Sequence, residues 1–145
     1  MIPSFEKSGL LPPGMHYATW NELTARFGIN KHRLKLLDGL KNGLNLLIEY
    51  GCKEACVNGS FVTAKVFPGD IDVCYDNTHM NWKKFTKEHQ EFVDARNGTL
   101  IMKQKYGCEF YAYNAFEDDI LRIFQFDKNN TPKGIIKLTL SEKML

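Results

Sequence analysis

The chain has 145 residues, 43% of them hydrophobic, and a formal net charge of +2 from 19 basic and 17 acidic residues. This length and composition predict a single domain with a hydrophobic core. The nearly balanced charge excludes a general electrostatic attraction to nucleic acid or to an anionic membrane. No apolar run approaches the ~18 residues that a membrane-spanning helix needs, so we expect no membrane partner.

Residues 1–18 contain three prolines and two glycines, a composition that predicts an extended arm at the start of the domain. Thr19 and Glu22 then have the spacing of a capping box. They predict a short helix that continues to about Phe27 and that Gly28 ends. The single predicted domain spans residues 1–145 and includes the arm.

Leucines recur at helical spacing from Asn30 to Tyr50, and Gly51 follows them, so the sequence predicts a long amphipathic helix. Gly39 and Gly43 lie four residues apart inside this helix. Each glycine costs roughly 1 kcal/mol relative to alanine in a helix interior. We therefore expect another element to pack closely against this part of the helix.

Two short segments, "EACVNGS" at 54–60 and "DIDVCYD" at 70–76, have the composition and alternation of strands. Successive side chains of a strand point to opposite faces. Asp70, Asp72 and Cys74 are therefore predicted on one face of the second strand, opposite its apolar side chains.

The remaining sequence predicts a helix from Trp82 to Val93, ended by Gly98, and then one or two strands in "TLIMKQKYGCEFYAYNAF" at 99–116. Glu109 is expected on the same side of that region as two tyrosines. The segment 120–140 predicts two strands joined by a turn. This order of elements predicts an α/β (α+β) fold, a mixed β-sheet flanked by helices.

Four cysteines, Cys52, Cys56, Cys74 and Cys108, lie in apolar or strand-like stretches and form no CxxC pair. The N-terminus lacks the charged-then-apolar pattern of a signal segment. Both observations predict a protein of the reducing cytoplasm. We expect Cys52 and Cys56 to act as small packing residues, because no second pair completes a tetrahedral metal site.

Two carboxylates on one strand face repel each other, and burying them without a partner is costly. A chain that keeps such a pair usually supplies a cation. Mg²⁺ fits best, because it binds few hard oxygen ligands and leaves positions for phosphate oxygens. At the end of the preceding strand, Gly59 allows the backbone to approach a phosphate and Ser60 adds a hydroxyl group. The pattern predicts a metal ion and a triphosphate at one place, with Ser60 near the start of a helix.

The Gly59–Ser60 pair, with "DIDV" beginning ten positions after Ser60, resembles the nucleotidyltransferase superfamily, the polymerase-beta-like fold. The resemblance implies that the Gly-Ser turn holds a nucleoside triphosphate and that Asp70 and Asp72 bind two Mg²⁺ ions. It also implies a third carboxylate on a later strand. The segments "LPPGMHYATW" and "KGIIKL" resemble a bacterial and phage branch of minimal members, which resemble toxin or antitoxin components.

One position differs from the pattern of many minimal members, and a second matches it less clearly. Lys65 stands in place of an arginine and is expected to contact phosphate as a point charge, without a bidentate fork. Glu109 is the expected third carboxylate because it lies on an apolar strand. Asp118 and Asp119 are the alternatives, although their surroundings are typical of a solvated turn.

The expected function is transfer of a nucleoside monophosphate from a nucleoside triphosphate to an acceptor hydroxyl, with release of pyrophosphate. The acceptor is a tRNA or a protein, and the chain is expected in a toxin–antitoxin system with a cognate toxin or antitoxin. Asp70, Asp72 and Glu109 are the expected catalytic and metal-binding residues. The alternative is a non-catalytic antitoxin or regulator that binds nucleotide or a partner on the same fold. The two unpaired carboxylates favour the enzyme.

Overall fold

Five strands form one mixed sheet in the computed structural model, which describes residues 1–114 and 119–142. The strand order is β1-β5-β2-β3-β4. β3 runs parallel to β4 and β1 parallel to β5, whereas β2 is antiparallel to both of its neighbours. The strand bounds are β1 Gly14–Tyr17, β2 Glu54–Asn58, β3 Ile71–Asp76, β4 Cys108–Tyr113 and β5 Gly134–Thr139. The predicted α/β class is confirmed.

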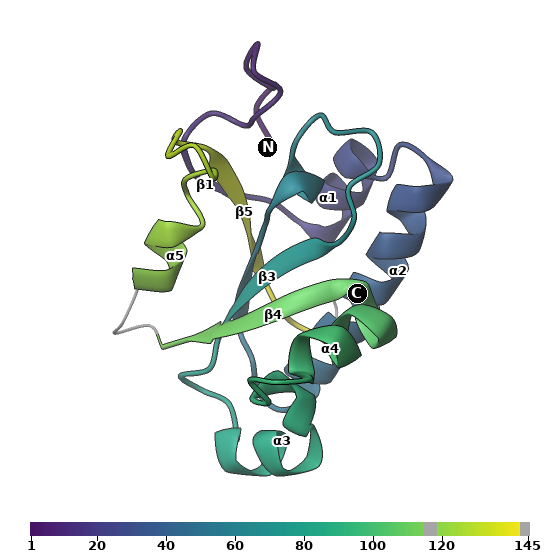
Figure 1. Cartoon of the computed structure of the whole chain (residues 1–145), viewed down its shortest axis with the longest axis vertical. Helices are drawn as coiled ribbons and strands as arrows, with labels where there is room; N and C mark the ends of the chain where they lie inside the picture. Colours follow the sequence, from purple (N-terminus) through teal and green to yellow (C-terminus); the bar gives the residue numbers. More distant parts are fainter. Residues whose placement is uncertain (115–118, 143–145) are drawn as a thin grey trace.

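Within the described residues, four helices cover one face of this sheet and a fifth lies on the other face (Figure 1). The first group comprises α1 Trp20–Phe27, α2 Lys31–Glu49, α3 Trp82–Glu88 and α4 Gly98–Tyr106, and the fifth helix is α5 Asp119–Ile123. The larger hydrophobic core lies between the sheet and the four helices. Of the helices that the structure describes, none is both long enough and apolar enough to cross a membrane.

The predicted boundaries of α1 and α2 are confirmed, because their capping residues act as expected. The backbone N–H of Glu22 donates to Thr19 Oγ1 at 3.1 Å, and the N–H of Thr19 donates to Glu22 Oε1 at 3.1 Å. At the start of α2, Asn30 Oδ1 accepts a hydrogen bond from the N–H of Arg33 at 2.8 Å. These bonds satisfy donors that the first turn of a helix leaves free.

The expected close packing against the glycines of α2 is also confirmed. A Cβ atom on Gly39 would lie 2.0 Å from the carbonyl oxygen of Tyr106, and one on Gly43 would lie 2.4 Å from Cζ of Phe110. The end of α4 and the middle of β4 therefore rest directly on the backbone of α2. This contact fixes where β4 enters the sheet, and with it the place of Glu109.

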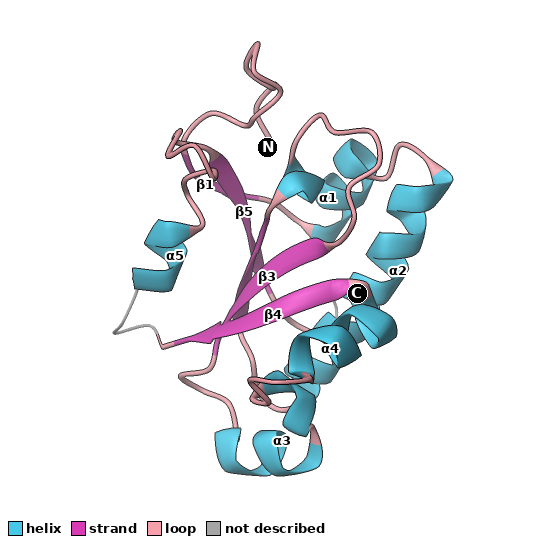
Figure 2. Cartoon of the chain, in the orientation of Figure 1, coloured by secondary structure: helices cyan, strands magenta, loops and turns pink. Residues whose placement is uncertain are grey.

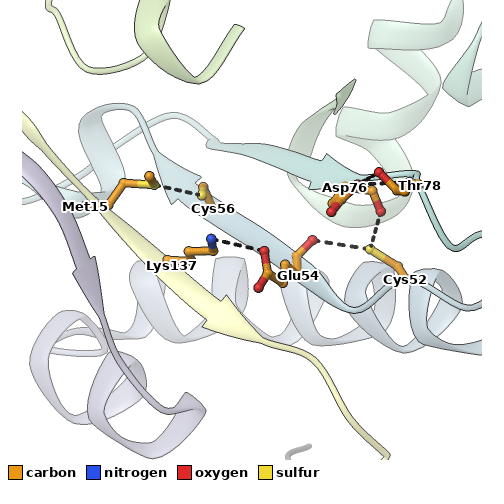
Figure 3. Close-up of polar contacts among 7 residues, drawn as sticks. All are labelled: Met15, Cys52, Glu54, Cys56, Asp76, Thr78 and Lys137. Atoms are coloured by element: carbon orange, nitrogen blue, oxygen red, sulfur yellow. Dashed lines mark hydrogen bonds and ion pairs between the residues drawn. The ribbon is translucent and has the colours of Figure 1, made fainter. Parts of the chain in front are cut away.

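The N-terminal arm packs on the domain; it is extended at β1, whereas residues 6–10 form a hydrogen-bonded turn. Gly14–Tyr17 of the arm form β1, which pairs with β5 at one edge of the sheet. Leu11 is buried, and Arg26 Nη1 donates to the carbonyl oxygen of Pro3 at 2.9 Å. Met15 Sδ lies 4.0 Å from Cys56 Sγ (Figure 3).

Of the one or two strands predicted in the segment 99–116, one is present as β4, but the start of the segment is the helix α4, which Gly98 begins (Figure 2). Most of its residues are good helix formers, and Gly107 ends the helix in the left-handed conformation at φ 67°. The strand β4 starts only at Cys108. The predicted helix from Trp82 also ends early, at Glu88, and a 3₁₀ turn at Gln90–Phe92 follows it.

The first of the two predicted C-terminal strands was wrong as well. Part of it is the helix α5. Leu121 of this helix belongs to the smaller hydrophobic cluster on the second face of the sheet, and Phe124, which follows the helix, packs against that cluster. The predicted turn is present: Asp127 Oδ1 accepts hydrogen bonds from two backbone N–H groups of the segment 129–131. In this turn region a bridge between Phe126 and Pro132 takes the place of a strand pair, and proline has no N–H with which to extend a ladder.

Polar contacts link residues near the start of β2 and the end of β3 (Figure 3). Cys52 Sγ lies 3.4 and 3.3 Å from the carbonyl oxygens of Glu54 and Asp76, either of which can accept the thiol hydrogen, and Lys137 Nζ lies 3.0 Å from Glu54 Oε2. Asp76 Oδ1 accepts a hydrogen bond from the N–H of Thr78 at 2.9 Å. These polar groups therefore have hydrogen-bond or ion-pair partners within the domain.

All four cysteines are free and buried. Burial raises the pKa of Cys52, Cys56 and Cys74 to about 12, so these thiols are protonated at neutral pH. The expectation that Cys52 and Cys56 serve as packing residues is confirmed.

Replacing Gly39 with alanine tests the contact between α2 and α4. Alanine favours a helix by roughly 1 kcal/mol over glycine. Its methyl group would nevertheless collide with the backbone of Tyr106, so we expect Gly39→Ala to lower the free energy of unfolding by about 1–3 kcal/mol. Urea denaturation measures the change, with Asn42→Ala at an exposed position of the same helix as the control. Equal stabilisation by both substitutions would contradict the contact.

Candidate metal and phosphate site

The pairing of three strands places the candidate residues in one row. Asn58 of β2 lies opposite Asp72 of β3, and Asp72 lies opposite Glu109 of β4. Residues paired in register point to the same face of a sheet. Asp72 and Glu109 are therefore on the face that α5 partly covers, away from the larger core.

Three carboxylates meet at this row. Asp70, Asp72 and Glu109 each contribute one oxygen to a group in which all three atoms lie within 4.8 Å of one another. Asp70 immediately precedes β3, and all three residues are partly buried. The structure thus brings together the three carboxylates singled out from the sequence. Of the two alternatives, Asp118 lies outside the described residues and Asp119 is the first residue of α5.

Lys103 neutralises two of the three carboxylates. Its Nζ lies 2.8 Å from Glu109 Oε1 and 3.2 Å from Asp70 Oδ2. The hydroxyl group of Tyr111 also donates to Glu109. Burial tends to raise the pKa of Glu109, but the hydrogen bonds from Lys103 and Tyr111 outweigh burial and hold that pKa below its usual value. Sequence analysis missed Lys103, because only a helix at 98–106 places it beside Glu109.

Asp72 is the carboxylate whose charge the protein neutralises least. Among the described residues it has no ion-pair partner within 4.0 Å, whereas Asp70 and Glu109 share Lys103. Burial first, and then the negative charges of Asp70 and Glu109, raise the pKa of Asp72 to about 6. Lys133 and Lys103 act against that rise. Asp72 therefore gains most from a nearby cation.

The Gly59–Ser60 turn packs directly on Asp72. Gly59 has φ 81°, which disfavours other residues, and a Cβ atom there would lie 2.5 Å from Asp72 Oδ2. The expected helix after Ser60 is only a 3₁₀ turn over Ser60–Val62. Position 59 therefore requires glycine both for its backbone conformation and for the space that Asp72 occupies.

Buried Arg33 holds the segment that follows this turn. Its guanidinium donates to the carbonyl oxygens of Phe61 at 2.7 Å and of Thr63 at 2.9 Å, and also to that of Lys65. The guanidinium group of Arg33 is thus used to bind backbone carbonyl oxygens. These hydrogen bonds fix the path of the segment 61–65, which follows Ser60.

A cavity of about 1040 Å³ opens beside Gly59, Ser60 and Asp72. Residues of α5 and of the turn after it form another wall, which carries Asp127 together with three basic and three apolar side chains: Arg122, Lys128, Lys133, Ile123, Phe124 and Phe126. Lys65, the expected phosphate contact, is exposed and is not among the described residues that line this cavity. The basic residues were missed because they lie some sixty residues or more beyond Ser60 in the sequence.

The donor set suits a hard divalent cation. Three carboxylate oxygens within 4.8 Å of one another are the ligand type that Mg²⁺ prefers, and Mg²⁺ needs few protein ligands when phosphate completes its shell. The side-chain oxygen of Asn58, whose residue pairs with Asp72, is a further candidate metal ligand. It is buried and has no hydrogen-bond partner among the described residues. The residues present fit the metal that the sequence predicts.

Fold and site together define a mixed α/β protein with a carboxylate cluster beside a partly basic cavity. The chain belongs to DUF6932, a family of unknown function, whose model matches residues 3–139. Searches of curated proteins and of solved structures found no match to the chain.

The raised pKa of Asp72 predicts how stability depends on pH. The folded state holds the Asp72 proton more tightly than the unfolded state, so the stabilisation is complete below about pH 4 and is lost as the pH rises through about 6. Asparagine does not ionise. We expect Asp72→Asn to be more stable than wild type by about 1 kcal/mol at pH 8 without metal, after allowance for solvent screening.

The measurement is urea denaturation of both proteins at pH 4.5 and pH 8, in the presence of a chelator. The advantage of the variant should shrink at the lower pH. A constant difference between the two proteins at both pH values would contradict a raised pKa for Asp72.

Proposed function

We propose that this protein is a metal-dependent nucleotidyltransferase, which moves a nucleoside monophosphate from a nucleoside triphosphate to an acceptor hydroxyl group. One observation carries the proposal: three carboxylate oxygens converge against the Gly59–Ser60 turn, at the wall of a cavity that also bears three basic side chains. A cation site and an anion site thus adjoin each other, as a metal-bound triphosphate requires.

The cavity supplies groups for each part of the nucleotide. Ser60 and the backbone of its turn bind phosphate oxygens, and Arg122, Lys128 and Lys133 balance the charge of the triphosphate. Phe124 and Phe126 offer an apolar surface to the base and the sugar.

Asp70, Asp72 and Glu109 would hold Mg²⁺, which when bound stabilises negative charge on the triphosphate. In the transfer, the acceptor oxygen forms a bond to the α-phosphorus, and the bond from that phosphorus to the oxygen bridging to the β-phosphate breaks. Pyrophosphate leaves with the electron pair of the broken bond. Glu109 helps to position the acceptor hydroxyl group or to take its proton as the new bond forms.

The proposed acceptor is the hydroxyl group of a tRNA or of a protein. In keeping with the sequence resemblance, we place the protein in a toxin–antitoxin system with a cognate toxin or antitoxin as its partner. The four free, buried cysteines support a reducing compartment, the cytoplasm.

One observation favours the alternative, a non-catalytic antitoxin or regulator that binds nucleotide or a partner. Lys103 already neutralises Asp70 and Glu109, so two of the three carboxylates have a cation without any metal. In such a module the cavity would bind its ligand without turnover.

Label transfer separates the two functions. The protein is incubated with each of the four α-³²P nucleoside triphosphates, Mg²⁺ and a cell extract, and tRNA and protein fractions are analysed for fixed label. We expect label with wild type and with Asp38→Asn, a matched change at an exposed position of α2, and none with Asp72→Asn. Absence of label with all four nucleotides would favour the binding module.

Nucleotide affinity tests the basic wall of the cavity. Lys133 lines the cavity, and its charge lowers the pKa of Asp72. Lys65 is exposed and is not among the described residues that line the cavity. We expect Lys133→Gln to weaken triphosphate binding in Mg²⁺ by about tenfold, because a contact to a charged group is lost. Lys65→Gln should leave binding unchanged. Calorimetric titration measures both, and a loss in Lys65→Gln equal to that in Lys133→Gln would contradict the assigned wall.

A further inference from the structure

We infer that Lys103 is a displaceable internal cation, which occupies the place between Asp70 and Glu109 until a divalent ion displaces it. This inference rests on the proposed metal site and concerns how metal binding at that site is regulated. The protein would thereby set the concentration of metal at which its site fills.

Lys103 bridges the two carboxylates, since its Nζ is within 3.2 Å of an oxygen of each one. Those two oxygens belong to residues of the three-carboxylate group. A divalent ion that used all three carboxylates would have to share Asp70 and Glu109 with the ammonium group, at a distance at which the two cations repel strongly. The metal ion and the ammonium group of Lys103 therefore compete for the carboxylates of Asp70 and Glu109.

The placement of Lys103 allows it to leave. It lies in the last turn of α4, and its side chain is 44% exposed, whereas those of Asp70 and Glu109 are 27% and 17% exposed. An ammonium group on a flexible stem can turn to water without any backbone movement. Asp70 and Glu109 lie beside and on paired strands, so they stay behind as ligands.

Lys105 offers a matched comparison on the same helix. Its side chain is 52% exposed, and its Nζ lies 2.7 Å from Glu91 Oε2. Glu91 is not one of the three clustered carboxylates. Both lysines are thus partly exposed and ion-paired, but only Lys103 contacts the proposed metal ligands.

The test measures Mn²⁺ binding from the electron paramagnetic resonance signal of the free ion, for wild type, Lys103→Gln and Lys105→Gln. Removing the competing charge should lower the Kd of Lys103→Gln by about tenfold, and Lys105→Gln should match wild type. A Kd for Lys103→Gln equal to or above that of wild type would overturn the inference while leaving the metal site in place. Absence of Mn²⁺ binding in every protein would overturn the proposed metal site and the inference together.

A second measurement needs no variant. Amine acylation followed by mass spectrometry reports the reactivity of each lysine in the wild-type protein. Saturation with Mn²⁺ should increase the acylation rate of Lys103 several-fold, because the amine loses both ion pairs, and should leave that of Lys105 unchanged. Unchanged acylation of Lys103 in the Mn²⁺-saturated protein would overturn the inference.

Discussion

The pairing of β2 with β3 and of β3 with β4 is the constraint on which the site depends. It places Asn58, Asp72 and Glu109 in one row, and it brings the Gly59 turn against Asp72. Because strand side chains alternate between faces, a shift of β3 by one residue would turn Asp72 into the larger core and expose Ile71 and Val73. The apolar residues that stabilise the sheet thus also fix the position of the carboxylates.

The same residues show a site that is held at a cost to stability. Gly59 adopts a positive φ of 81°, which disfavours other residues, and Asp72 lies partly buried beside two further carboxylates with a pKa of about 6. Lys103 relieves the repulsion for Asp70 and Glu109 only. Functional sites often carry such local costs, which the remaining core must offset. The close contacts of Gly39 and Gly43 with α4 and β4 are part of that support.

The sequence was sufficient to predict what depends on local pattern. Alternation placed Asp70 and Asp72 on one face, and caps and spacing located α1 and α2. It was not sufficient for α4, whose apolar residues show no clear helical period, or for α5. The contacts of Lys103 and Lys133 depend on how distant elements meet, so no local pattern of residues indicates them. The exposed position of Lys65 was missed for the same reason.

The most direct test of this account is an anomalous difference map from crystals grown with Mn²⁺ and a non-hydrolysable nucleoside triphosphate. We expect a manganese peak bound by Asp72 together with Asp70 or Glu109, triphosphate density along Ser60 and the basic wall of the cavity, and Lys103 turned to solvent. Triphosphate density elsewhere on the protein, or no manganese at these carboxylates with Lys103 still bridging Asp70 and Glu109, would contradict the account.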